Sequence, residues 1–200
     1  MTNVLVLYYS RSGSVSGMAR EVARGVSTVA GVEARLRTVP AVMVKGQSTD
    51  DHTDDRDNTV LMCTADDLQQ CHGLVLGSPC RFSHMAAPLR YFFDQNAASW
   101  ANGSLLDKPA AVFTSSSSLH GGQESTLLSM MTLLFHHGML VMGLPYSEPA
   151  LHHTTTGGGP YGASHVATNG TTVLSDDEKH LCRQLGKRVA QFALRLHVPV

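Results

Sequence analysis

The chain has 200 residues, of which 42% are hydrophobic and 16% are charged, and its formal net charge is −1. This length and apolar content are enough for one substantial domain over residues 1–200. The near-zero net charge disfavours nucleic acid and anionic membranes as partners. Because no apolar run reaches transmembrane length and the first is too short for a signal peptide, we expect a cytoplasmic protein.

The first forty residues are predicted to form a strand, a helix and a second strand. Residues 4–9 are a continuous apolar run, which is typical of a parallel strand buried on both faces. Residues 16–30 place apolar side chains at helical spacing and are followed by Gly31, a common residue after a helix. Residues 33–39 alternate weakly between apolar and polar side chains and stop at Pro40.

Residues 41–64 break this alternation. They are polar, carry five aspartates between Asp50 and Asp57, and show neither a helical nor a strand period. We therefore expect a surface insertion. The segment lacks the ligand positions and the glycine of an EF-hand calcium loop. A short helix over residues 65–70, with Thr64 as its N-cap, is predicted to end the insertion.

Two further pairs of a strand and a helix follow. Residues 74–76 form the third expected strand, and the next helix begins near Pro88, because proline is favoured in a first helical turn. Residues 110–114 form the fourth strand and residues 124–137 the helix after it, while Trp100 lies in a polar connection. The expected buried stripes are Leu89, Phe92 and Phe93 on the first helix, and Leu127, Leu128, Met131, Leu134 and Phe135 on the second.

The last third of the chain is predicted to hold a fifth strand, a long irregular segment and a closing helix. The strand covers residues 139–144. Residues 146–174 are rich in glycine and threonine, which is uncommon in a compact domain unless the segment is functional or covers a neighbour. Three of its glycines formally match Gly-x-Gly-x-x-Gly, but no strand precedes them and a proline interrupts them, so we reject a dinucleotide motif. Ser175 and Glu178 have the spacing of a capping box at the start of the closing helix.

Strands that alternate with helices in this way predict an α/β protein with a doubly wound, five-stranded parallel sheet and helices on both faces. Ligands bind such sheets at the carboxyl ends of the strands. Three loops at these ends are rich in hydroxyl groups or glycine: residues 10–15, 78–82 and 115–122. Because they lie on one edge of the sheet, we expect them to form one site.

The first of these loops suits a phosphate group. It joins a strand to a helix, so backbone N–H groups and the helix dipole point at one spot. It has no lysine of a Walker loop and only Gly13 in place of the three Rossmann glycines. A cup of hydroxyls and amides fits a terminal monophosphate better than a di- or triphosphate. The alternative is an ordinary turn in which Ser14 or Ser16 caps the helix.

Cysteine and histidine residues indicate neither disulfides nor a metal site. The four cysteines show no Cys-x-x-Cys spacing, and a domain of this size needs no disulfides, so reduced thiols are expected. Eleven histidines are present, but they include no His-Glu-x-x-His motif. We therefore expect no metal ion.

Six segments together resemble a known family, the WrbA group of flavodoxin-like NAD(P)H:quinone oxidoreductases, and the similarity extends over nearly the whole chain. Any one segment alone is a weak signal, whereas six in the same order are specific. The matching segments are VLVLYYS at residues 4–10, GSPCRF at 77–82, FFDQ at 92–95, GGQE at 121–124, HHGM at 136–139 and PYGAS at 160–164.

The resemblance implies a flavodoxin-like fold and non-covalently bound FMN, whose phosphate would lie in the first loop. It also implies a homotetramer with shared sites, in which Trp100 closes over the flavin from a neighbouring subunit and His136 lies at the flavin ring. The implied flavin-binding residues are Ser10, Arg11, Ser12, Gly13, Ser14, Val15, Cys80, Arg81, Phe82, Ser115, Ser116, Ser117, Ser118, Leu119, His120, Gly121 and His136.

Three positions depart from the family pattern. Cys80 replaces a threonine, and Ser117 and Ser118 replace Gly-Thr. Ser12 stands where a tyrosine often contacts the nicotinamide nucleotide, so Ser12 and Trp100 are the expected substrate-side residues. FMN binding should tolerate these changes. The choice between NADH and NADPH stays open.

The implied reaction passes a hydride from NAD(P)H to flavin N5 and then to a quinone in the same pocket. The flavin carries this chemistry, so the protein needs no acid–base pair. Loop amides and His136 would stabilise the charge of the reduced ring, although His136 could instead cap its helix. Two alternatives are a flavodoxin-type electron carrier, a class that tends to be strongly acidic, and an FMN-binding regulator or scaffold without turnover.

Overall fold

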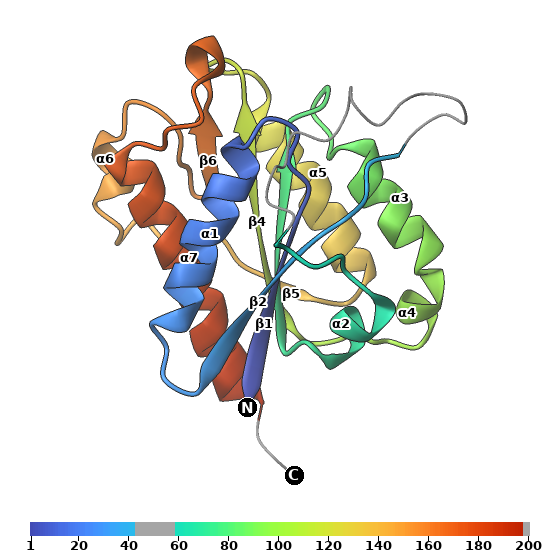
Figure 1. Ribbon diagram of the computed structural model, residues 1–200. Helices are drawn as coiled ribbons and strands as arrows, with labels where there is room; N and C mark the ends of the chain where they lie inside the picture. The colour runs from blue at the N-terminus through green and yellow to red at the C-terminus, as the bar shows by residue number, and fades with distance from the viewer. Residues whose placement is uncertain (43–58, 198–200) are drawn as a thin grey trace.

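A computed structural model describes residues 1–42 and 59–197 of the chain (Figure 1). Its centre is a parallel sheet with the order β2-β1-β3-β4-β5, and β6 also pairs with β4. This is the doubly wound arrangement that the sequence predicted, in the flavodoxin-like form that the resemblance implied, but the sheet has six strands where five were expected. The strands are β1 (Thr2–Tyr8), β2 (Val32–Thr38), β3 (Gly73–Pro79), β4 (Pro109–Ser116), β5 (Leu140–Val141) and β6 (Ala163–Val166).

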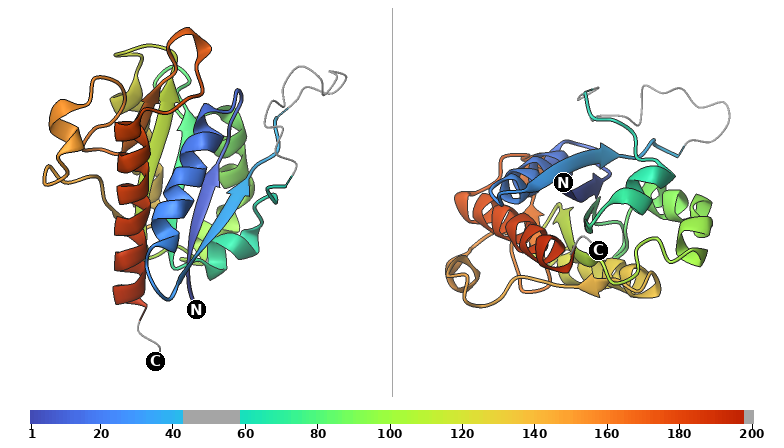
Figure 2. Two further views of the ribbon diagram at one scale, coloured as in Figure 1. Left: turned by 60° about the vertical axis from the view of Figure 1, so that its left-hand side comes forward. Right: turned by 90° about the horizontal axis from the view of Figure 1, so that it is seen from below.

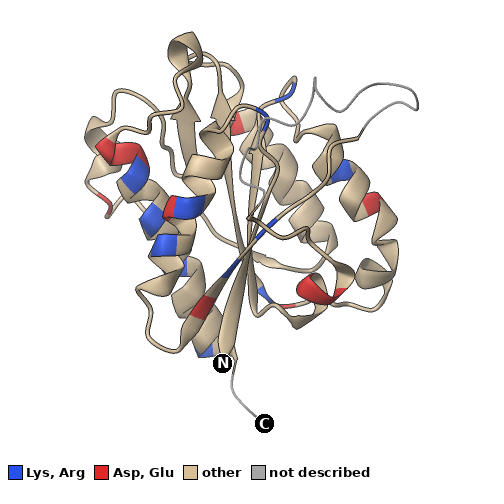
Figure 3. Cartoon of the chain, in the orientation of Figure 1, with Lys and Arg blue, Asp and Glu red and all other residues tan. Residues whose placement is uncertain are grey.

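The central strands form the core because their side chains are apolar on both faces. In β1, Val4 and Val6 belong to one hydrophobic cluster and Leu5 and Leu7 to the other, on the opposite face of the sheet. Figure 3 shows the inner strands without charged residues, whereas β2 at the edge carries both acidic and basic ones. Full burial fits a strand covered by helices on both sides.

Helices lie on both faces of the sheet, and a closely packed pair covers one of them (Figures 1 and 2). In this pair, a Cβ on Gly25 would lie 2.0 Å from the backbone oxygen of Arg183, and one on Gly186 would lie 2.1 Å from that of Val22. The first face carries α1 (Ser14–Ser27) and α7 (Asp176–Leu196), and the second α2 (Ala65–Gln70), α3 (Ala87–Gln95), α4 (Ala97–Ala101) and α5 (Gln123–His136).

The predicted fifth strand is wrong in its extent. Of the predicted residues, only the two of β5 pair with β4, at its start, and β6 pairs with the end of β4 after an excursion over residues 142–162. The N–H of Leu144 donates to the carbonyl oxygen of Pro160, at 2.9 Å, and Pro145 has no N–H that could bond to a neighbouring strand. The excursion carries α6 (Ala150–His153), and β6 is followed by the short η2 (Thr168–Gly170). The rejected glycine motif lies in the excursion.

Other predictions are confirmed or corrected locally. Both expected caps are present, because Thr64 forms a capping box with Asp67 and Ser175 forms one with Glu178. Trp100, expected in a polar connection, lies in the short helix α4. Most of the expected acidic insertion, residues 43–58, lies outside the described residues. Within the part of the chain that is described, no helix is both long and apolar enough to cross a membrane.

Candidate functional site

The turn between β1 and α1 is built around Ser10 and Gly13. The buried Ser10 hydroxyl accepts the N–H of Gly13, with Oγ and N 3.2 Å apart. Gly13 adopts φ +95°, and no side chain caps α1. Ser14 and Val15 are already in the first turn of the helix and are buried, whereas Arg11 and Ser12 are exposed. The first-turn N–H groups of α1 therefore face the carboxyl edge without a side-chain acceptor.

The loop after β3 is a tight turn that exposes an aromatic ring. Arg81 and His84 exchange two backbone hydrogen bonds, at 2.9 and 3.0 Å. Phe82 and Ser83 between them have φ of 51° and 68°, and the Phe82 side chain is 97% exposed. Positive φ is strained for a residue such as phenylalanine, so the turn holds this ring outward at an energetic cost.

The loop after β4 is held by its own polar groups. The Ser116 hydroxyl, the Gly121 N–H and the Gln123 amide all donate to the carbonyl oxygen of Ser118, at 2.8, 3.0 and 3.0 Å. A Cβ on Gly121 would lie 2.8 Å from that oxygen, so glycine is required there. His120, with φ of 56°, is exposed at the rim. Ser115 and Ser116 end β4, and Ser117 to Gly121 form the loop.

Cys80 joins the second and third loops. Its N–H donates to the carbonyl oxygen of Ser115 at 2.8 Å, and its thiol donates to that of Gly121 at 3.1 Å. The buried hydroxyl of Thr126 in α5 donates to the Cys80 sulfur at 3.1 Å. The cysteine that replaces the family's threonine therefore still makes a polar bridge between the loops. All four cysteines are free thiols.

Trp100 and His136 do not lie with these loops. The Trp100 indole N–H donates to the backbone oxygen of His136, at 2.7 Å. His136 is the last residue of α5, a 14-residue helix that starts at the third loop. A helix of that length spans about 20 Å, so both residues lie at the opposite end of the molecule. Within one chain they are separated from the other predicted site residues.

The charge of the three loops suits an anion. Residues 10–15, 80–83 and 115–122 contain two arginines, one histidine and no carboxylate. Both helices that start in these loops, α1 and α5, follow a glycine with positive φ and lack a side-chain cap. Free N–H groups at a helix start bind phosphate well. The residues present therefore fit a ligand with a terminal phosphate.

Some residues at this edge were not predicted. The Ser83 hydroxyl lies 3.3 Å from an ideal Cβ on Gly122, and the Thr126 hydroxyl donates to the Cys80 sulfur. Thr172 was included only within the long segment, yet its methyl carbon lies 3.5 Å from an ideal Cβ on Gly13. No short sequence signal marks such a contact, because the two residues are far apart in the chain.

Comparisons with known proteins agree with this geometry. The model of the family described as NADPH-dependent FMN reductase matches residues 2–151. The chain belongs to this family. A relative from Gluconacetobacter diazotrophicus, named NAD(P)H dehydrogenase (quinone), is 40% identical over 199 residues, which cover 98% of this chain and 99% of the relative. A relative of the same name from Geotalea daltonii is 39% identical, over 96% of this chain and 97% of its own.

Solved structures confirm the fold of this FMN reductase family member. A flavodoxin, WrbA-like protein from Agrobacterium tumefaciens superposes with a TM-score of 0.68 and 22% identity, covering 98% of this chain and 99% of that chain. Flavodoxin 1 from Bacillus cereus gives 0.61 and 16%, covering 99% and 100%. Together with the relatives at about 40% identity, these matches confirm the family resemblance drawn from the sequence.

Proposed function

We propose that the protein is an FMN-dependent NAD(P)H:quinone oxidoreductase. The observation that carries the proposal is the meeting of three loops at one sheet edge, with two arginines, no carboxylate and an uncapped helix start. The family match and the relatives named NAD(P)H dehydrogenase (quinone) support the same activity. The alternatives, an electron carrier or an FMN-binding scaffold, have no comparable support.

Each loop has a distinct task in this proposal. Ser10 to Val15 would hold the FMN phosphate through N–H groups, hydroxyls and the Arg11 side chain. Cys80 to Phe82 and Ser115 to Gly121 would hold the ring, and the N–H groups that are not bonded within these loops would lie at its polar edge. FMN, when bound, supplies the hydride chemistry. One face of the ring would stay open near the exposed Ser12, so that NADH or NADPH and then a quinone occupy the same place in turn.

We further propose that the site is completed in a homotetramer in the cytoplasm. Trp100 and His136 cannot reach the three loops of their own chain, so they would act on the site of a neighbouring subunit. The outer face of α5 supports self-association: Leu128 and Phe135, which the sequence predicted to be buried, are 45% and 60% exposed. Burial of such apolar side chains between subunits is favourable.

The deciding experiment is steady-state oxidation of NADH and NADPH with benzoquinone by FMN-loaded protein. We expect turnover with at least one nucleotide and a mass of four chains in solution. If the protein binds FMN but oxidises neither nucleotide, the proposed enzymatic activity is wrong and an FMN-binding scaffold is favoured. Reversible electron exchange with a redox protein, in the absence of quinone turnover, would favour the carrier.

A further inference from the structure

The segment after β6 passes beside the turn between β1 and α1. Because β6 runs parallel to the end of β4, the chain leaves β6 at the same edge as the other loops, and the N–H of Ala167 donates to the oxygen of Ser116 at 2.7 Å. The segment then descends to the start of α7, next to α1 (Figure 1). On this path the methyl carbon of Thr172 comes 3.5 Å from an ideal Cβ built on Gly13. Apart from Gly13 and its two neighbours in the chain, no other atom of the described residues lies within 4 Å of that Cβ.

Thr172 is exposed, and its side chain has no hydrogen-bond partner among the described residues. Residues 167–174 contain no carboxylate. The Thr172 atom nearest to Gly13 is the methyl carbon, and rotation about the Cα–Cβ bond exchanges the positions of the methyl and the hydroxyl. The hydroxyl, which has no partner among the described residues, can therefore turn toward an anion bound close to the start of α1. Core packing does not explain the position of Thr172, because its neighbours Thr171 and Val173 are exposed as well.

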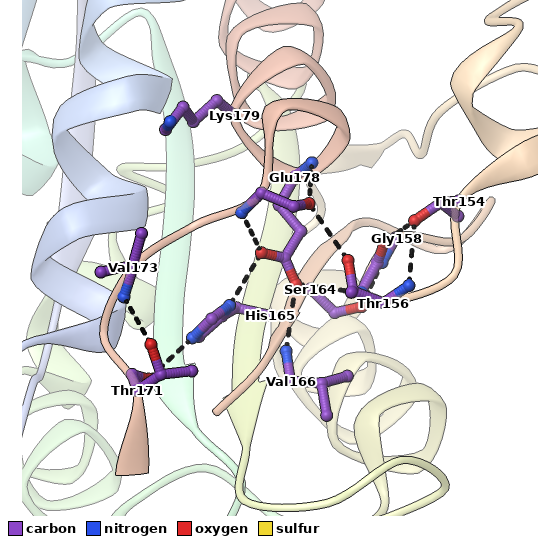
Figure 4. A network of polar contacts seen from close by, with 12 residues as sticks. Thr154, Thr156, Gly158, Ser164, His165, Val166, Thr171, Val173, Glu178 and Lys179 are labelled. Carbon is purple, nitrogen blue, oxygen red and sulfur yellow. Dashed lines mark hydrogen bonds and ion pairs between the residues drawn. The ribbon is translucent and has the colours of Figure 1, made fainter. Parts of the chain in front are cut away.

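A buried pair of side chains fixes this segment (Figure 4). The His165 ring contacts the carbonyl oxygen of Thr171 through Nε2, at 3.1 Å, and the Glu178 carboxylate through Nδ1, at 2.9 Å. Glu178 also accepts the N–H groups of Gly157, Val166 and Ser175, at 3.0, 3.2 and 2.8 Å. Both side chains are 1% exposed. One ion pair thus ties β6, the segment and the start of α7 together.

The hydrogen-bond partners set the protonation state of the pair. A carbonyl oxygen and an ionised carboxylate only accept, so both nitrogens of His165 must donate and the ring is positively charged. Burial lowers the pKa of His165, but the hydrogen bonds to Glu178 and Thr171 and the charge of Glu178 raise it by more, so the net shift is upward. Glu178 is the only charged side chain among the described residues that shifts it.

We propose that Thr172 is a further binding residue for the FMN phosphate and that His165, held by Glu178, is the positioning residue that places it there. The inference rests on the function proposed above. His165 fixes the Thr171 carbonyl oxygen inward, and this orients the next residue toward Gly13. The Thr172 hydroxyl then donates to a phosphate oxygen, in addition to the N–H groups of α1.

The test compares the dissociation constants of FMN and riboflavin, measured by quenching of flavin fluorescence in the full-length protein. Thr172→Val keeps the shape of the side chain and removes the donor. We expect it to weaken FMN about tenfold, as for the loss of a hydrogen bond to a charged group, and to leave riboflavin unchanged. Thr168→Val, an exposed threonine earlier in the same segment, is the matched control and should change neither constant.

His165→Gln tests the positioning role. We expect it to weaken FMN about fivefold with no effect on riboflavin, and to have no further effect in a protein that already carries Thr172→Val, because the two residues act as one unit. A purely structural role would weaken both flavins, or add to the Thr172 effect. Either result would overturn the role of His165.

The possible failures are distinguishable. If the wild-type protein binds neither flavin, the proposed function fails. If it prefers FMN but Thr172→Val leaves the ratio of the two constants unchanged, or changes it as Thr168→Val does, the function stands and this inference is wrong. Thermal melting of each variant at the assay pH checks that it is folded at the assay temperature.

Discussion

The helices α1 and α7 start at the same edge of the sheet and lie side by side, but their first turns are built differently (Figures 1 and 2). In α7, the Ser175 hydroxyl accepts the N–H of Glu178, and the Glu178 carboxylate accepts the N–H of Ser175. Three acidic residues follow one another in that turn. In α1, the cap position is Gly13, no side chain of the cap accepts an N–H group of the first turn, and that turn has no acidic residue.

This difference separates a helix start that serves stability from one that serves binding. The first turn of α7 satisfies its own N–H groups and complements the helix dipole with negative charge. The first turn of α1 leaves the same groups and the same dipole to an external anion. If this division is right, changes in α7 should alter the free energy of unfolding, and equivalent changes in α1 should alter the affinity for FMN.

The largest expected effect is on α7. Glu178→Gln removes the charge that pairs with the buried His165 and turns an amide NH2 toward backbone N–H groups. We expect the free energy of unfolding to fall by about 3 kcal/mol, because one partner of a buried ion pair is left without its counter-charge. Urea unfolding measures this. Asp177→Asn in the same turn, at a half-exposed pair with His153, is the control and should stay within about 0.5 kcal/mol.

The pH dependence of this loss has a definite sign. Burial raises the pKa of Glu178, but hydrogen bonds from His165, Ser175 and Val166 lower it to about 2 from 4.5. Its contribution is therefore present above pH 4.5 and is lost as the pH falls toward 2. The pKa of His165 is raised above 6.5, so its contribution is present below that pH and is lost as the pH rises through the raised value. A difference between wild type and Glu178→Gln that does not shrink at both ends would contradict the pair.

The next effect is on α1. Gly13→Asp gives this helix start the negative charge that α7 already has, and Gly13→Asn is the neutral variant of the same shape. Both substitutions are strained at φ +95°, but to the same extent because the two side chains have the same shape, and the contact with Thr172 is an ordinary one. We expect Asp to weaken FMN on the order of a hundredfold more than Asn does, because a carboxylate would lie a few ångströms from the phosphate. The dissociation constant of riboflavin, which has no phosphate, should differ little between the two variants. Equal FMN constants for Asp and Asn would place the phosphate elsewhere.

Sequence reasoning found the turn before α1 and the cap of α7 for a local reason, although α1 begins at Ser14 and not at the predicted residue 16, and no serine caps it. The turn at Ser10 to Gly13 and the capping box of Ser175 and Glu178 each depend on residues within a few positions of one another. Spacing alone therefore identified them. The same holds for the strands β1, β3 and β4, whose apolar runs are buried on both faces. The loops at their carboxyl ends followed from the parallel order of the sheet.

The misses depend on contacts between distant parts of the chain. The pairing of His165 with Glu178 needs β6 to return to the edge of β4 after the excursion, which no local pattern indicates. The split of the fifth strand has the same origin. On α5, Leu128 and Phe135 follow the helical spacing of the buried side chains but face outward, since an apolar residue near the edge of the stripe can lie on either side of it.

The smallest expected effect isolates the cap of α7 from its buried pair. Ser175→Ala removes the hydroxyl that accepts the Glu178 N–H but leaves the carboxylate, its backbone donors and His165 in place. We expect a loss of about 1 kcal/mol in the free energy of unfolding, typical of a lost N-cap, and unchanged constants for both flavins. Ser10→Ala is the matched change at α1, because it also removes a hydroxyl that accepts a backbone N–H. It should weaken FMN more than riboflavin. If Ser175→Ala also shifted the ratio of the two flavins, the first turn of α7 would belong to the binding site, and the division between the two helix starts would be wrong.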